Sequence, residues 1–330
     1  MKNKHRTDRF KKNQKVENIL QLLDKNLRSV EKKLIREYTT SDYPTIFIFG
    51  CARSGTTLLH QYVSQNLKCI YPTNFISRFY YAPYLGGLYY KLFTDLDDRG
   101  ELLGGPERDV DDFFSSDLGK TEGIHSPNEF WYFWRKHFPI NNQRTIDRQK
   151  IDSQKAIFFR NSIFALQNLY DGPFIMKGMI ANNCIDMLSE LFPKAVFLFI
   201  RRDLFANAKS LYKARLDYFD TPKQWYSFYP KEKEVYQDLS PEEQVVRQVL
   251  DTNDQILQSL NMCNNKRTIK LDYEPFCKAP KTVLELLKNT DESIQVNADP
   301  VPSKFTIREK KGLEGQADTA IKSVIKNLET

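Results

Sequence analysis

The sequence predicts an α/β protein with three layers, in which helices cover both faces of a central parallel sheet. Short apolar segments rich in β-branched and aromatic residues occur at Thr45–Phe49 (TIFIF) and Ala195–Ile200 (AVFLFI). Each is followed by a segment with helical periodicity. Strands that are apolar along their whole length are typical of parallel sheets buried on both faces. Alternation of such strands with helices therefore predicts this fold class.

The remaining elements follow the same alternation along the chain. Residues 14–38 carry apolar side chains at helical spacing between charges, which predicts an amphipathic helix. A glycine-rich loop and a helix over 58–67 follow the first strand. Further strand and helix pairs are expected at Phe174–Lys177 with Cys184–Phe192, at Ala195–Ile200 with Leu204–Leu216, and at Thr268–Leu271 with Lys281–Lys288.

The chain divides into a leading part and one domain. Residues 1–40 read as a basic tail with the amphipathic helix, and the run Met1–Lys15 is expected to be solvated. Residues 41–330 form the domain. Within it, the stretch at about 75–170 is aromatic-rich, and we expect an irregular insertion that covers a site.

Composition limits the function classes. The 330 residues include 41% hydrophobic and 28% charged residues, as in ordinary soluble proteins. The formal net charge of +7 favours anionic ligands. No zinc-finger spacing, basic region with heptads or RNP-like signature occurs, so no nucleic-acid partner is predicted.

Cysteine usage and hydropathy indicate a compartment. The five cysteines are odd in number and form no CxxC pair, which predicts neither a disulfide framework nor a zinc site. The N-terminus has no apolar core of a secretory signal, and no run of about 18 apolar residues predicts a membrane-spanning helix. We expect a cytoplasmic protein.

The loop Gly50–Thr57 (GCARSGTT) carries most of the functional information. Its two glycines have the spacing of a phosphate-binding P-loop, in which backbone N–H groups surround a phosphate at a helix N-terminus. A Walker A loop has lysine after the second glycine, where this chain has Thr56. The cation within the loop is Arg53. The missing lysine weakens the interpretation as a kinase, which needs it together with Mg²⁺.

GCARSGTTLL resembles the 5′-phosphosulfate loop of PAPS-dependent sulfotransferases of the bacterial type. The resemblance covers roughly residues 44–290 and implies a P-loop-type fold. It implies transfer of a sulfuryl group from PAPS to a hydroxyl or amine of a glycan or other small-molecule acceptor, releasing PAP. It also implies that Arg53 lies near the bridging oxygen, and that the 5′-phosphate is cradled by Ser54, Gly55, Thr56 and Thr57.

Three later segments extend the resemblance. FLFIRRDLFANAKSLYKAR is similar to the family's 3′-phosphate motif, with Arg202 and Ser210 at the matching positions. A surface ion pair is the alternative for Arg202. Tyr273 matches a tyrosine at the adenine, and its alternative is a tyrosine that ends a strand. Lys310 and Lys311 are weaker candidates for a basic loop over the 3′-phosphate.

The catalytic residues depart from the family pattern. Lys177 stands where a lysine can stabilise the leaving oxygen, but Met179 replaces the usual histidine base. HSPNEFWYFW is similar to a bacterial segment in which Glu129 is retained, so Glu129 is the expected base. The alternatives are His125 as base, and a Glu129 that merely caps or pairs on a helix.

The reaction needs no metal, and no metal-ligand cluster appears in the sequence. Two other functions remain open at this point. One is a P-loop kinase or other nucleotide transferase. The other is a non-catalytic module that binds PAP or an anionic glycan.

Overall fold

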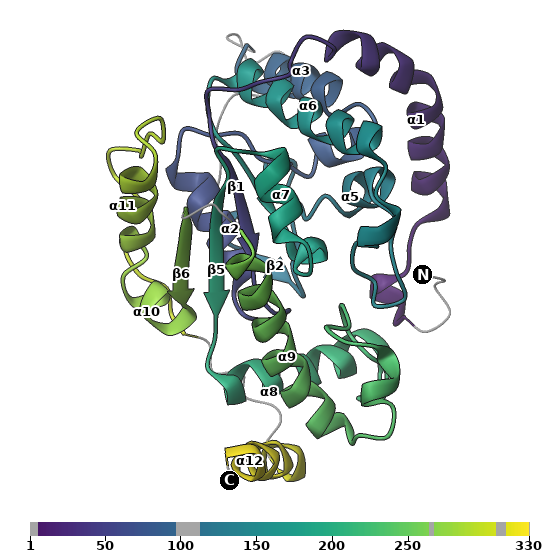
Figure 1. Ribbon diagram of the computed structural model, residues 1–330, viewed down its shortest axis with the longest axis vertical. Coiled ribbons are helices and arrows are strands. Elements are labelled where there is room, and N and C mark those ends of the chain that lie inside the picture. The colour runs from purple at the N-terminus through teal and green to yellow at the C-terminus, as the bar shows by residue number, and fades with distance from the viewer. Residues whose placement is uncertain (1–5, 97–112, 264–266, 308–314, 330) are drawn as a thin grey trace.

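A computed structural model describes residues 6–96, 113–263, 267–307 and 315–329 (Figure 1). Its main sheet has four parallel strands in the order β4-β1-β5-β6. Their bounds are β1 Thr45–Phe49, β4 Phe174–Lys177, β5 Val196–Arg201 and β6 Thr268–Asp272. The predicted strands are thus confirmed to within two residues, and the parallel pairing agrees with their continuous apolar sequences.

Alternate residues of the strands point into two separate cores. Phe47 and Phe49 of β1 belong to the core that α5, α6 and α7 cover. Ile46 and Ile48 belong to the core on the other face, under α2 and α11. This two-sided burial confirms the three-layer α/β class, and Figure 1 shows α7 and α11 on opposite sides of the sheet. The helices around the sheet are α2 Thr56–Asn66, α7 Ile185–Leu191, α8 Leu204–Phe219, α9 Pro241–Asn261, α10 Tyr273–Lys278, α11 Lys281–Thr290 and α12 Gln316–Glu329.

The expectation of an irregular insertion at about 75–170 is wrong for much of its length. It contains α3 Pro83–Thr94, α5 Trp131–His137 and α6 Ser153–Tyr170, together with a short hairpin of β2 Ser116–Asp117 and β3 Lys120–Thr121. Several of the aromatic residues that obscured the pattern are core residues of these helices, among them Tyr90, Phe133 and Phe159. Phe133 of α5 stacks on Phe159 of α6 at 4.8 Å between ring centroids.

Residues 6–15 are mostly exposed, as predicted, but Phe10 attaches them to the domain, and residues 1–5 lie outside the described part of the chain. A single turn at Asp8–Phe10 precedes α1, Gln14–Leu34. Phe10 is only 3% exposed and stacks on Tyr218 at 4.6 Å between ring centroids. The backbone N–H of Thr7 donates to Tyr218 O at 3.1 Å. One buried aromatic ring thus holds an otherwise highly charged segment against the domain.

Within the described ranges, none of the helices combines the length and the apolar character needed to cross a membrane.

Candidate active site

A cavity of about 1500 Å³ lies at the carboxyl edge of the sheet. Loops that follow parallel strands converge at this edge, which is where ligands bind in such folds. The walls come from the β1–α2 loop, the ends of β4 and β5, α8, the β2–β3 hairpin, α5 and the segment 6–13. Of the described residues that the sequence nominates for donor binding, all except Ser54 line this cavity.

The β1–α2 loop has a backbone that its sequence makes possible. Gly55 adopts φ +103°, and a Cβ there would lie 2.3 Å from Cδ2 of Tyr273. Only glycine permits both this conformation and this approach. Arg53 also has a positive φ, of 69°. The loop therefore closes tightly around its centre, with the tyrosine ring packed directly on the glycine.

Ser54 and Arg202 each have a buried polar atom without a hydrogen-bond partner among the described residues. The Ser54 side chain is fully buried, and its Oγ has no hydrogen-bond partner among the described residues. Arg202 Nε is likewise buried without a hydrogen bond there, and the Glu274 carboxylate stands 3.9 Å away. Buried donors in native proteins are normally satisfied. A phosphate oxygen in the cavity would satisfy Arg202 Nε, whereas Ser54 does not line the cavity and its Oγ stays without a partner among the described residues.

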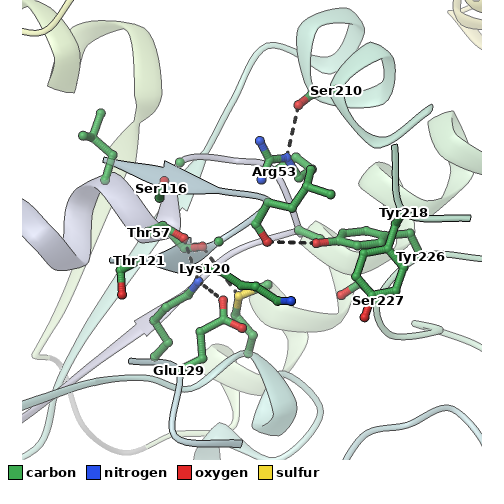
Figure 2. Close-up of a pocket in the computed structure, with 18 of the residues that line it drawn as sticks. Arg53, Thr57, Ser116, Lys120, Thr121, Glu129, Ser210, Tyr218, Tyr226 and Ser227 are labelled. Atoms are coloured by element: carbon green, nitrogen blue, oxygen red, sulfur yellow. Dashed lines mark hydrogen bonds and ion pairs between the residues drawn. The ribbon is translucent and has the colours of Figure 1, made fainter. Parts of the chain in front are cut away.

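Arg53 joins the loop to α8. Its Nε donates to Ser210 Oγ at 3.3 Å, as Figure 2 shows. Arg202 donates from Nη1 to Arg53 O at 3.4 Å, and its guanidinium lies 4.8 Å from the Tyr273 ring centroid. The two residues of the expected 3′-phosphate motif therefore both contact Arg53. The guanidinium of Arg53 points toward α8 and not toward Lys177.

Asn207 is a loop support that sequence reasoning missed. Its side-chain amide donates to Ala52 O at 2.9 Å, and the residue is fully buried. An asparagine four residues into an α-helix gives no sequence signal for such a contact. The hydrogen bond fixes the loop carbonyl from the α8 side.

A second group of contacts connects the loop to α5. Lys177 Nζ at the end of β4 donates to Thr57 Oγ1 at 3.0 Å and forms an ion pair with Glu129 Oε1. Trp131 Nε1 donates to the other oxygen of the same carboxylate. Lys177 is 4% exposed and Glu129 22% exposed at the side chain. Thr57 and Glu129 thus share Lys177 as a partner, and Figure 2 shows these two side chains near one another.

The aromatic residues beside Glu129 in the sequence divide into core residues and one residue that contacts the carboxylate. Phe130, Phe133 and Trp134 are buried in the core, and Trp134 Nε1 donates to Lys177 O at 3.2 Å. Of these four aromatic residues, only Trp131 donates a hydrogen bond to the Glu129 carboxylate. The apolar neighbours in sequence thus hold the β4 end and α5 in place, and the indole of Trp131 orients Glu129.

The alternative base lies elsewhere. His125 Nδ1 pairs with Tyr90 OH at 2.6 Å, and His125 is not among the cavity-lining residues. Lys310 and Lys311 lie outside the described residues. Burial raises the pKa of Tyr273 to about 12, which keeps its hydroxyl neutral.

Tyr226 is a further wall residue that the sequence did not indicate. Its hydroxyl donates to Leu118 O at 3.2 Å, and burial raises its pKa above the ordinary value. It links the loop after α8 to the β2–β3 hairpin, opposite Glu129 in Figure 2. In the part of the chain that the structure describes, no three His, Cys, Asp or Glu side chains gather as a possible metal site.

Comparison with known proteins agrees with this geometry. A family model described as the sulfotransferase family matches residues 44–289, well over half of the chain. The chain therefore belongs to the sulfotransferase family. Omega-hydroxy-beta-dihydromenaquinone-9 sulfotransferase Stf3 of Mycobacterium bovis is 27% identical over 172 residues, which are 48% of this chain and 42% of that protein. The Mycobacterium tuberculosis protein of the same name matches equally. The match thus spans less than half the length of these curated relatives.

Solved sulfotransferase structures resemble the backbone at low identity. STF9 from Mycobacterium avium has a TM-score of 0.49 at 14% identity, covering 93% of this chain and 73% of that chain. STF1 from Mycobacterium tuberculosis has a TM-score of 0.48 at 12% identity, covering 90% and 76%.

Proposed function

We propose that this member of the sulfotransferase family transfers a sulfuryl group from PAPS to a hydroxyl or amine of an acceptor and releases PAP. The phosphate loop and the unsatisfied Nε of Arg202 support binding of a nucleotide with phosphates at two positions. Tyr273, packed on Gly55, is the proposed contact for the adenine.

The proposal rests above all on the position of Lys177. One ammonium group contacts both Thr57 of the phosphate loop and the carboxylate of Glu129. The site for the leaving oxygen and the site for the acceptor proton are therefore within reach of one side chain. A protein that only bound a nucleotide or a glycan would not require one lysine that contacts both the phosphate loop and this carboxylate.

The proposed roles follow from sulfuryl-transfer chemistry. The acceptor oxygen or nitrogen bonds to sulfur while the bond from sulfur to the 5′-phosphate oxygen breaks. Glu129 takes the acceptor proton as general base. Lys177 and Arg53 supply positive charge to the leaving oxygen and the transferring group. Trp131 keeps the carboxylate in place through its second oxygen.

The proposal includes the cellular compartment in which the protein acts. All five cysteines are unpaired with one another. Free thiols are typical of a reducing compartment, which supports a cytoplasmic site of action.

Calorimetric titration with PAP, with and without Mg²⁺, tests the donor site. We expect metal-independent binding that Arg202→Ala weakens by about 2 kcal/mol or more, near thirtyfold, because a charged hydrogen bond to phosphate is lost. Arg201→Ala is the matched control: Arg201 is the adjacent arginine, it pairs with Asp272 at 3.0 Å, and it does not line the cavity. Equal loss in both variants would refute the assignment.

Turnover distinguishes the proposal from the alternatives. Glu129→Gln should retain PAP binding and lose transfer by roughly 10²- to 10⁴-fold, the usual contribution of a general base. Tight PAP binding by the wild type without transfer to any acceptor would favour the non-catalytic module. Mg²⁺-dependent ATP binding with indifference to PAP would favour the nucleotide transferase.

A further inference from the structure

Cationic side chains from three distant parts of the chain meet at the acceptor side of the cavity. They are Arg6 of the N-terminal segment, Lys120 of β3 and Arg135 of α5, and all three line the cavity. We call this group the cationic end. Figure 2 shows Lys120 extending into the same space as Glu129, with Tyr218 beyond it.

Aromatic rings hold the three cations in place. Lys120 Nζ lies 4.5 Å from the ring centroid of Phe10, and that ring stacks on Tyr218. The Arg6 guanidinium lies 5.5 Å from the Tyr218 centroid. Cation–π contacts orient a charge without neutralising it, so the positive charge of Lys120 remains available to a ligand.

The third cation stands next to the proposed base. The Arg135 guanidinium lies 5.9 Å from the ring centroid of Trp131. The indole N–H of the same tryptophan donates to Glu129 Oε2. One indole ring therefore contacts both the Arg135 guanidinium and the carboxylate of Glu129.

Nearby carboxylates already have partners. Asp117 pairs with Arg9 at 2.9 Å. Glu17 accepts from Lys12 at 2.9 Å and from Tyr132 OH at 2.5 Å. Neither Lys120 nor Arg135 makes an ion pair with any residue of the described ranges.

Two side chains of the cationic end, Lys120 and Arg135, have lowered pKa values. Burial, and next the charge of Arg6, lower the pKa of Lys120, while Asp117 partly opposes this change. Burial also lowers the pKa of Arg135, Tyr132 opposes this, and the charge of Arg6 adds to it. Like charges that lie close together repel one another, and an anion placed among them relieves this repulsion.

We propose that the cationic end binds an anionic group of the acceptor, so that the acceptor is a hydroxyl- or amine-bearing carboxylate, sulfate ester or phosphate ester. The inference rests on the proposed function, because it assigns Glu129 to the acceptor. An anionic group on Arg135 and Lys120 places the rest of the molecule over Trp131, with its nucleophile toward Glu129. Arg6 and Phe10 make the N-terminal segment part of this site.

Calorimetry with inorganic sulfate as the probe tests the subsite. The protein is saturated with PAP so that the phosphate loop is filled, and chloride keeps the ionic strength constant. Three proteins are compared: the wild type, a Lys120→Met and Arg135→Met double variant, and a Lys281→Met and Lys288→Met control. The control removes the same charge from exposed positions on α11, outside the cavity.

We expect sulfate to bind the wild type and the control equally, and the double variant at least tenfold more weakly. Equal binding to all three proteins, or no binding to the wild type, would overturn the proposal. PAP titrations of the same samples report on the donor site separately. If PAP fails to bind while sulfate still distinguishes the double variant from the control, the proposed function fails and the anion subsite stands.

The charge of the products tests the acceptor class. The wild type is incubated with ³⁵S-labelled PAPS and a mixture of small metabolites, and labelled products are separated by electrophoresis. One transferred sulfuryl group adds one negative charge, so products of acceptors that bear an anionic group and no cationic group carry at least two. We expect such products from the wild type and a tenfold loss of them in the double variant. Products with a single negative charge would overturn the proposal, and no product at all would count against the proposed function.

Discussion

Glu31 provides a quantitative test of how α1 is attached to the domain. Its side chain is fully buried and accepts from the backbone N–H groups of Tyr84 at 2.8 Å and Leu85 at 3.1 Å. These N–H groups lie in the first turn of α3, where no helical carbonyl can accept from them. Burial raises the pKa of Glu31 to about 7, although the two backbone donors oppose the change.

The shift has a definite sign and size. Between pH 4.5 and about 7, the native protein keeps a proton on Glu31 that the unfolded chain has released. The free energy of unfolding therefore falls as the pH rises through this window. At 1.36 kcal/mol per pKa unit, the loss is about 3 kcal/mol.

Two buried histidines act in the opposite direction. Burial, together with the charge of Lys177, lowers the pKa of His60 to about 3. Burial lowers that of His137 to about 4. Each histidine makes the protein more stable as the pH rises toward 6.5, because the unfolded state holds the extra proton. The pH profile of the wild type alone therefore cannot isolate Glu31.

The difference between Glu31→Gln and the wild type removes the histidine contributions. Urea unfolding followed by tryptophan fluorescence at pH 4.5 to 8 gives both free energies. We expect the variant to gain about 3 kcal/mol relative to the wild type between pH 4.5 and 7.5. The exposed Glu37→Gln is the control. A difference curve that is flat, or that matches the control, would refute the reasoning.

Three further variants test the site. Gly55→Ala should weaken PAP binding by about ten- to a hundredfold in calorimetry, because the new Cβ meets Tyr273 and the positive φ costs ~1–3 kcal/mol. Asn207→Ala should lower the free energy of unfolding by about 1–3 kcal/mol in urea titrations, since the Ala52 carbonyl loses its donor. Phe10→Ala should speed tryptic cleavage near residue 11 roughly tenfold or more, as release of the segment 6–13 exposes it, while PAP binding stays unchanged. Unchanged PAP affinity in Gly55→Ala, unchanged stability in Asn207→Ala, or unchanged cleavage in Phe10→Ala would contradict the corresponding expectation.

The strands were predictable because their sequences leave little choice. Thr45–Phe49 is fully buried, so its apolar run could not lie at the surface. α9 was not predicted, although Val245, Val249 and Ile256 are buried at helical spacing. The helices at 75–170 were missed because glycines and clustered aromatics mask their periodicity. Packing between α5 and α6 overrides those local signals.

The donor side and the acceptor side of the cavity differ in how far the sequence can predict them. Lys177 ends a strand and Arg202 directly follows one, and the topology of a parallel sheet brings strand ends to one edge. No comparable rule of sheet topology predicts that the residues of the cationic end lie together. Arg6 meets Lys120 only because Phe10 stacks on Tyr218, a contact that spans more than 200 residues of sequence. The proposed donor contacts thus depend on sheet topology, because they lie at or next to strand ends. Acceptor preference depends on side-chain contacts that can change without disturbing the sheet.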